Sequence, residues 1–81
     1  MRNNIITWLR CAGWTLVVID EDAMLFEENS TGMLYIVRDY PFINSFSIYN
    51  LSWRVIKPKW YRIQTNGVIM RDYWLEKEQN E

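Results

Sequence analysis

The chain has 81 residues, a length typical of one folded domain, and we expect residues 1–81 to form a single domain. Hydrophobic residues make up 49% of it and charged residues 23%, which is a globular rather than a disordered composition. Nine basic and ten acidic residues nearly cancel, and histidine is absent. Since histidine is the commonest general base and metal ligand, its absence argues against most enzyme classes and metal sites.

The single cysteine, Cys11, has no partner in the chain for a disulfide or a cysteine-based metal site. Small secreted domains usually need disulfides, so we expect a cytoplasmic location. The apolar stretch 5–19 is interrupted by Arg10 and is shorter than the roughly 20 residues that cross a bilayer. We therefore predict no membrane segment, no cofactor and no bound metal, and we expect Cys11 to be a small buried residue.

The first predicted element is a helix over residues 4–12. Asn3 or Asn4 can cap its beginning, and Gly13 can end it. Four apolar residues recur at the spacing that places them on one face of a helix. They are Ile5, Trp8, Leu9 and Ala12.

Three strands are predicted next, joined as a meander. Residues 14–20 are rich in β-branched side chains and apolar on both faces, which is typical of a central strand covered on both sides. Glu21 and Asp22 form a tight reversal into a second strand at 24–28. A turn cluster, Asn-Ser-Thr-Gly, separates that strand from a third at 33–40.

The second half of the chain predicts a second meander. Residues 49–55 alternate between apolar and polar side chains, which favours a strand, although the aromatic spacing over 42–53 also fits a helix. The Asn-Gly dipeptide at 66–67 is a strong signal for a two-residue type I′ turn between strands at 59–65 and 68–75.

These turns predict a strand register. A two-residue turn at 66–67 pairs Arg62 with Arg71, and a three-residue connection at 57–59 pairs Arg54 with Arg62. The arginines then lie in a row on one sheet face, with two aromatic side chains beside them. The candidate binding residues are Arg54, Trp60, Arg62, Arg71 and Tyr73.

Charge is distributed in blocks along the chain. Residues 20–28 contain five acids and no base, residues 40–71 contain five bases and no acid, and residues 72–81 are mainly acidic. The arginine row could pair internally with these acids, extend into water, bind an acidic protein surface, or bind nucleic-acid phosphates and bases. The sequence pI near 5.4 ranks nucleic acid lower.

The expected fold is mainly β with one N-terminal helix and about six antiparallel strands in two three-stranded meanders. A sandwich or small barrel fits this pattern, and a two-layer α+β sheet is the alternative. An exposed apolar strip with edge strands would also permit a homodimer.

The leading functional hypothesis is a non-enzymatic protein-binding module, an inhibitor or adaptor of the kind that phages and mobile elements use against host enzymes. Its expected partner is a protein with an acidic surface, bound by the basic-aromatic sheet face. The first alternative is a single-stranded nucleic-acid-binding protein that uses the same face. The second is a self-assembling structural subunit.

Overall fold

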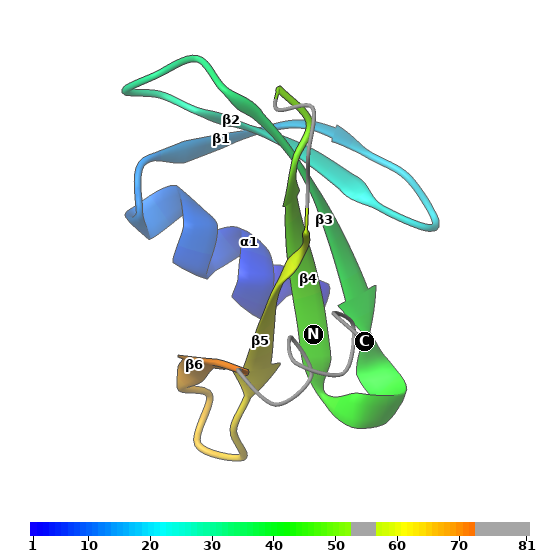
Figure 1. The fold of residues 1–81 in the computed structure, drawn as a ribbon. Helices are drawn as coiled ribbons and strands as arrows, with labels where there is room; N and C mark the ends of the chain where they lie inside the picture. The colour runs from blue at the N-terminus through cyan, green and yellow to red at the C-terminus, as the bar shows by residue number, and fades with distance from the viewer. Residues whose placement is uncertain (53–56, 73–81) are drawn as a thin grey trace.

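The computed structural model describes residues 1–52 and 57–72 and arranges them as one helix packed on a six-stranded sheet (Figure 1). The mainly β fold, with its N-terminal helix and six antiparallel strands, is therefore confirmed. The elements are α1 (Arg2–Cys11), β1 (Trp14–Ile19), β2 (Met24–Glu28), β3 (Leu34–Tyr40), the short 3₁₀ helix η1 (Pro41–Ile43), β4 (Ser45–Asn50), β5 (Lys59–Ile63) and β6 (Ile69–Arg71).

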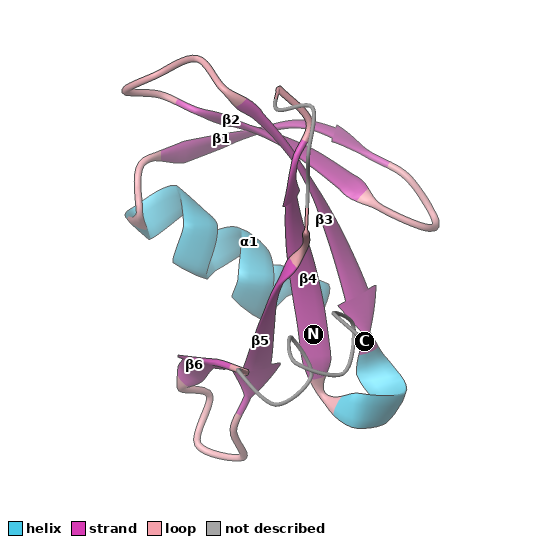
Figure 2. Ribbon diagram, viewed as in Figure 1, coloured by secondary structure: helices cyan, strands magenta, loops and turns pink. Residues whose placement is uncertain are grey.

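All six strands belong to one sheet in the order β1-β2-β3-β4-β5-β6, and each strand is antiparallel to the strands beside it. Pairing of β3 with β4 joins the two predicted meanders, and the sheet does not close into a barrel. Figure 2 shows that the sheet is strongly twisted, so that β1 and β2 cross the direction of β4 and β5, with α1 on one face. This is the arrangement of the two-layer alternative.

Helix α1 forms because its apolar residues follow the helical period. Ile5 and Leu9 lie one turn apart and are buried against the sheet. Met1 occupies the N-cap without a side-chain hydrogen bond, so the predicted asparagine cap is wrong. Gly13 ends the helix as predicted, with φ at +91°, a conformation that favours glycine.

Cys11 is exposed, contrary to the prediction that it is buried. It follows Leu9 by two residues, which rotates it roughly 200° around the helix axis and away from the sheet. The ten residues of α1 are too few to span a bilayer, and no other helix in the described residues is long and apolar enough to do so.

The helix is also held at its first turn by polar contacts. The Arg2 guanidinium forms an ion pair with Asp39 of β3 at 3.2 Å and donates a hydrogen bond to the Glu21 carbonyl of the β1–β2 turn. These contacts connect the beginning of α1 to β3 and to the β1–β2 turn.

One hydrophobic cluster lies between α1 and the sheet. Its aromatic part joins the helix to the central strands, because the Trp8 ring contacts Phe46 and Tyr61 at centroid distances of 6.0 and 5.4 Å. Phe46 and Tyr61 also stack on each other at 5.2 Å. The buried members of the cluster are Ile5, Leu9, Met24, Phe26, Val37, Phe46 and Ile48.

Strand β1 is at the edge of the sheet, so the prediction that it is central is wrong. Its last three side chains, Val17, Val18 and Ile19, are each about half exposed, at 51%, 53% and 52%. A bulge between Leu16 and Val18 interrupts the pairing with β2. The run of apolar residues therefore reflects an unusually apolar edge rather than burial on two sides.

Strand β4 begins four residues earlier than predicted. The segment is a strand, as preferred over the helical alternative, but it covers Ser45–Asn50, and residues 53–56 of the predicted strand lie outside the described residues. Phe46 and Ile48 face α1, while Ser45 and Ser47 are buried on the other face. The strand in which successive side chains point to opposite faces therefore begins before the predicted segment 49–55.

Replacing Phe46 with alanine should lower the free energy of unfolding by about 3–5 kcal/mol, because its fully buried ring connects Trp8 to Tyr61. Urea unfolding of the variant measures this loss. Phe42→Ala is the matched control, since Phe42 is fully exposed and its loss should change stability by no more than about 0.5 kcal/mol. Equal effects of the two substitutions would contradict the assigned core.

Candidate functional site

The β5–β6 hairpin decides whether the predicted arginine row exists. The Gln64 amide donates to the Val68 carbonyl at 2.8 Å, so the connection contains three residues and not two. Gly67 adopts φ of +84°, and the Asn66 side chain accepts a hydrogen bond from the Val68 amide at 3.1 Å. This is the geometry of a three-residue hairpin loop with glycine in the left-handed conformation. The predicted type I′ turn is therefore wrong.

The extra loop residue shifts the register by one position. Arg62 pairs with Met70, and Arg71 pairs with Tyr61, so Arg62 and Arg71 lie on opposite faces of the sheet. Arg62 forms an ion pair with Asp72 at 2.9 Å, in agreement with the interpretation that acids of the chain neutralise the arginines. The predicted row is thus not formed by these two residues.

Of the other three predicted binding residues, the structure describes Trp60 alone. Arg54 and Tyr73 lie outside the described residues. Trp60 is only 6% exposed and its ring packs against Tyr40 at 4.9 Å, so it is not the accessible aromatic side chain that the predicted binding face requires. Its indole Nε1 is buried and has no hydrogen-bond partner among the described residues.

A different surface appears on the sheet face that α1 leaves uncovered. Val18, Leu25, Ile36 and Tyr49 are directly opposite one another on β1, β2, β3 and β4. Val18 is 53% exposed and the other three are half-buried. We call these four residues the apolar row. Sequence reasoning missed it because its members come from four strands whose registers had to be known together.

The apolar row ends beside a small hollow of about 250 Å³ on the same face. Ile36 and Tyr49 of the row line it, together with the cationic side chain of Arg38. The uncovered face therefore combines aligned apolar side chains with a shallow depression, as protein-binding surfaces often do.

The free edge of β1 adjoins the apolar row. Among the described residues β1 pairs with β2 alone, so the backbone groups along its other side have no strand partner. Natural sheets usually protect such edges with charged residues, proline or bulges. From Trp14 to Ile19 the strand contains no charged residue and no proline, and its single protective feature is the bulge.

Charges of opposite sign lie beyond the two ends of β1. Arg10 is exposed in the last turn of α1, shortly before the strand begins. Asp20, Glu21 and Asp22 are exposed in the turn directly after the strand ends. The edge therefore has a basic beginning and an acidic end.

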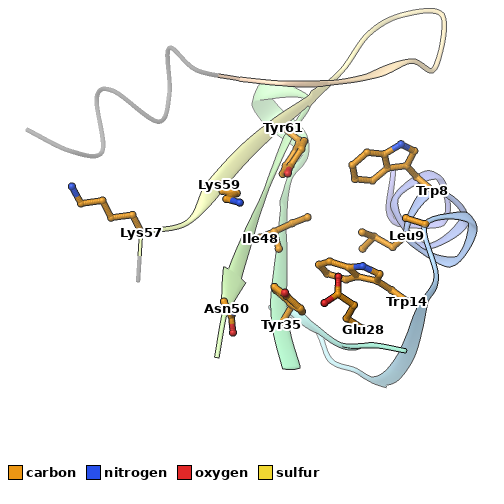
Figure 3. A pocket seen from close by; sticks show the side chains of 11 residues that line it. Trp8, Leu9, Trp14, Glu28, Tyr35, Ile48, Asn50, Lys57, Lys59 and Tyr61 are labelled. Carbon is orange, nitrogen blue, oxygen red and sulfur yellow. The ribbon is translucent and has the colours of Figure 1, made fainter. Parts of the chain in front are cut away.

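A pocket of about 440 Å³ opens on the other face of the sheet, beside α1 (Figure 3). Its volume falls within the range of small-molecule sites. Two pairs of aromatic rings form its walls, Trp14 with Tyr35 and Trp8 with Tyr61. The lining residues are Trp8, Leu9, Ala12, Trp14, Glu28, Tyr35, Ile48, Asn50, Lys57, Lys59 and Tyr61.

The charged side chains around this pocket differ in their contacts and in their positions. The Glu28 carboxylate accepts a hydrogen bond from the Thr31 hydroxyl at 2.6 Å. Burial raises the pKa of Tyr35 from its ordinary value of 10.0, and the neighbouring Glu28 carboxylate raises it further. Lys59 lies over the pocket beside Ile48, whereas Lys57 extends away from it.

The described residues contain no group of three or more His, Cys, Asp or Glu side chains that could hold a metal ion. Comparison with models of protein families, with curated proteins and with solved structures finds no significant match in any of the three. The surfaces described above are therefore the basis on which a function can be proposed.

The raised pKa of Tyr35 predicts a loss of stability in alkali. The folded state favours the neutral phenol of Tyr35, and this preference contributes to the free energy of unfolding. The contribution is complete below pH 10.0 and declines as the pH rises above that value. Tyr35→Phe should lose less stability than the parent protein between pH 8 and pH 11, as measured by urea unfolding. An unchanged decline in Tyr35→Phe would contradict the assignment.

Proposed function

We propose that this chain is a small protein-binding module that pairs the β1 edge with an extended strand of its partner, with the apolar row as the adjoining contact surface. The observation that carries the proposal is the exposed, uncharged edge of β1, beside which the described part of the chain places no strand. The proposal keeps the predicted class of function but moves the binding surface away from the arginines.

Strand addition is the recognition mode that such an edge favours. An extended chain laid beside β1 would satisfy the backbone donors and acceptors along its open side, and the side chains would supply apolar contact. Val18 and Ile19, each about half exposed, would become covered. Burial of apolar surface contributes roughly 25 cal/mol per Å², which adds to the backbone hydrogen bonds.

The charges at the two ends of β1 favour a second copy of this chain as the partner. Antiparallel pairing of two β1 strands around a two-fold axis would place the beginning of each strand opposite the end of the other. Arg10 of one copy would then lie near the acidic turn 20–22 of its partner. A parallel arrangement would instead bring like charges together, which disfavours it.

Such a dimer would have a further binding surface. The two-fold axis of an antiparallel pair is perpendicular to the sheet, so the uncovered faces of both copies would lie on the same side. The two apolar rows would then be neighbours, since each begins at Val18 beside the shared edge. An adaptor or inhibitor could use this enlarged apolar surface to bind another protein. The nucleic-acid alternative is not proposed, because Arg62 and Arg71 lie on opposite faces.

Replacing Val18 with lysine should abolish dimer formation, because it introduces a positive charge into the shared edge near the two-fold axis. Sedimentation equilibrium over a range of concentrations should give twice 9.9 kDa for the parent protein and 9.9 kDa for the variant. Val68→Lys is the matched control, since Val68 is 50% exposed but lies in the β5–β6 hairpin. It should remain dimeric.

Circular dichroism and urea unfolding establish that both lysine variants are folded. A parent protein that is monomeric at all concentrations would overturn the proposed pairing, and so would a Val18→Lys variant that associates as strongly as Val68→Lys.

Reversing the charge at Arg10 tests the direction of pairing. Arg10→Glu should weaken the dimer several-fold, because it faces the acidic turn 20–22 in the antiparallel arrangement and exposed ion pairs contribute roughly 0.2–1 kcal/mol each. Arg38→Glu, a reversal of an exposed arginine on β3, is the control. The dissociation constants of the parent protein and of Arg10→Glu should differ at low salt and converge at high salt, because salt screens the interaction between exposed charges. An affinity unaffected by Arg10→Glu would exclude this arrangement.

A further inference from the structure

The pocket beside α1 lies on the sheet face opposite the apolar row and has the walls of a small-ligand site. At one end the Trp14 and Tyr35 rings stack at a centroid distance of 4.1 Å and an interplanar angle of 28°. At the other end Trp8 and Tyr61 lie 5.4 Å apart. All four rings are half-buried, so parts of their surfaces remain open toward the pocket.

The floor between these ring pairs is apolar. Leu9 of α1 is 1% exposed and Ile48 of β4 is 7% exposed, and both line the pocket. Aromatic side chains favour offset-stacked or edge-to-face contacts with other aromatic rings. A planar ring that entered between the two walls would find such partners on both sides and an apolar surface beneath it.

Negative and positive charges lie in different parts of the pocket. Glu28 accepts the Thr31 hydroxyl and faces Tyr35, so its negative charge lies at the Trp14–Tyr35 end of the pocket. Lys59 pairs with Ile48 in the sheet and therefore lies on the pocket side, where it is exposed. Among residues 1–52 and 57–72, no carboxylate forms an ion pair with it. A cation beside aromatic walls complements a ligand that carries both an aromatic ring and a negative charge.

We infer that this pocket binds a small planar aromatic anion, such as an aromatic carboxylate. The ring stacks between the Trp14–Tyr35 and Trp8–Tyr61 pairs, and the anionic group is placed beside the Lys59 ammonium. The volume of about 440 Å³ admits a ligand with a single ring or with two fused rings.

Three probes with the same ring but different charge test this inference: naphthalene-2-carboxylate, 2-naphthylmethanol and 2-naphthylmethylammonium. Titrations followed by NMR should shift the indole N–H signals of Trp8 and Trp14, which line the pocket. The carboxylate should bind about threefold more tightly than the neutral alcohol and the ammonium least tightly, since one exposed charge pair contributes roughly 0.2–1 kcal/mol.

Lys59→Gln should remove the preference for the carboxylate and leave the affinity for the alcohol unchanged. Arg38→Gln is the control, because Arg38 is an exposed cation that does not line the pocket. Trp14→Leu should weaken all three probes, because it removes one wall. Circular dichroism checks that each variant is folded.

The same titrations in Val18→Lys separate this site from the β1 edge, since the pocket lies on the other sheet face and does not include Val18. The three probes should bind to the pocket of Val18→Lys with the same affinities as to the pocket of the parent protein. The inference is overturned if the carboxylate shifts neither Trp8 nor Trp14 at millimolar concentration, if the ammonium binds as well as the carboxylate, or if Lys59→Gln leaves the preference intact.

Discussion

Packing of one short helix on a six-stranded sheet is the constraint on which the other features depend. Helix α1 has ten residues and is therefore about 15 Å long. Six strands spaced about 4.8 Å apart form a sheet more than 20 Å wide. Ile5 and Leu9 can cover the middle of one face, where the fully buried residues gather, but they cannot cover the whole sheet. The molecule must therefore expose apolar surface elsewhere.

The exposed surfaces follow from this limited coverage. Beside the helix, large aromatic side chains extend over the part of the sheet that α1 does not reach, and they form the walls of the pocket. On the other face, which α1 does not cover, the apolar row crosses β1 to β4. At the edge, β1 follows α1 directly and has a neighbour on one side alone among the described residues. A partner strand and a small aromatic ligand would each cover one of these surfaces.

Much of the fold could be predicted from local signals, whereas most of the candidate site could not. The bounds of β2 at Met24–Glu28 agree with prediction because turn residues mark both ends. The predicted arginine row was wrong because a single loop residue decides the register. Asn66-Gly67 is compatible with both a two-residue and a three-residue loop. Once Gln64 pairs with Val68, Arg62 and Arg71 are on opposite faces, whatever their charge.

By itself the sequence determined the kinds and order of the elements, because helical spacing at Ile5 and Leu9, β-branched runs and glycine turns act over a few residues. It also determined that the chain would have aromatic and apolar side chains in excess of a small core. Only the tertiary structure decided where they lie. An apolar run such as Trp14–Ile19 suits a central strand or an edge equally well, and its position depends on which strands pair beside it. Burial and register are properties of the assembled sheet, so the edge, the apolar row and the pocket could not be predicted from local sequence.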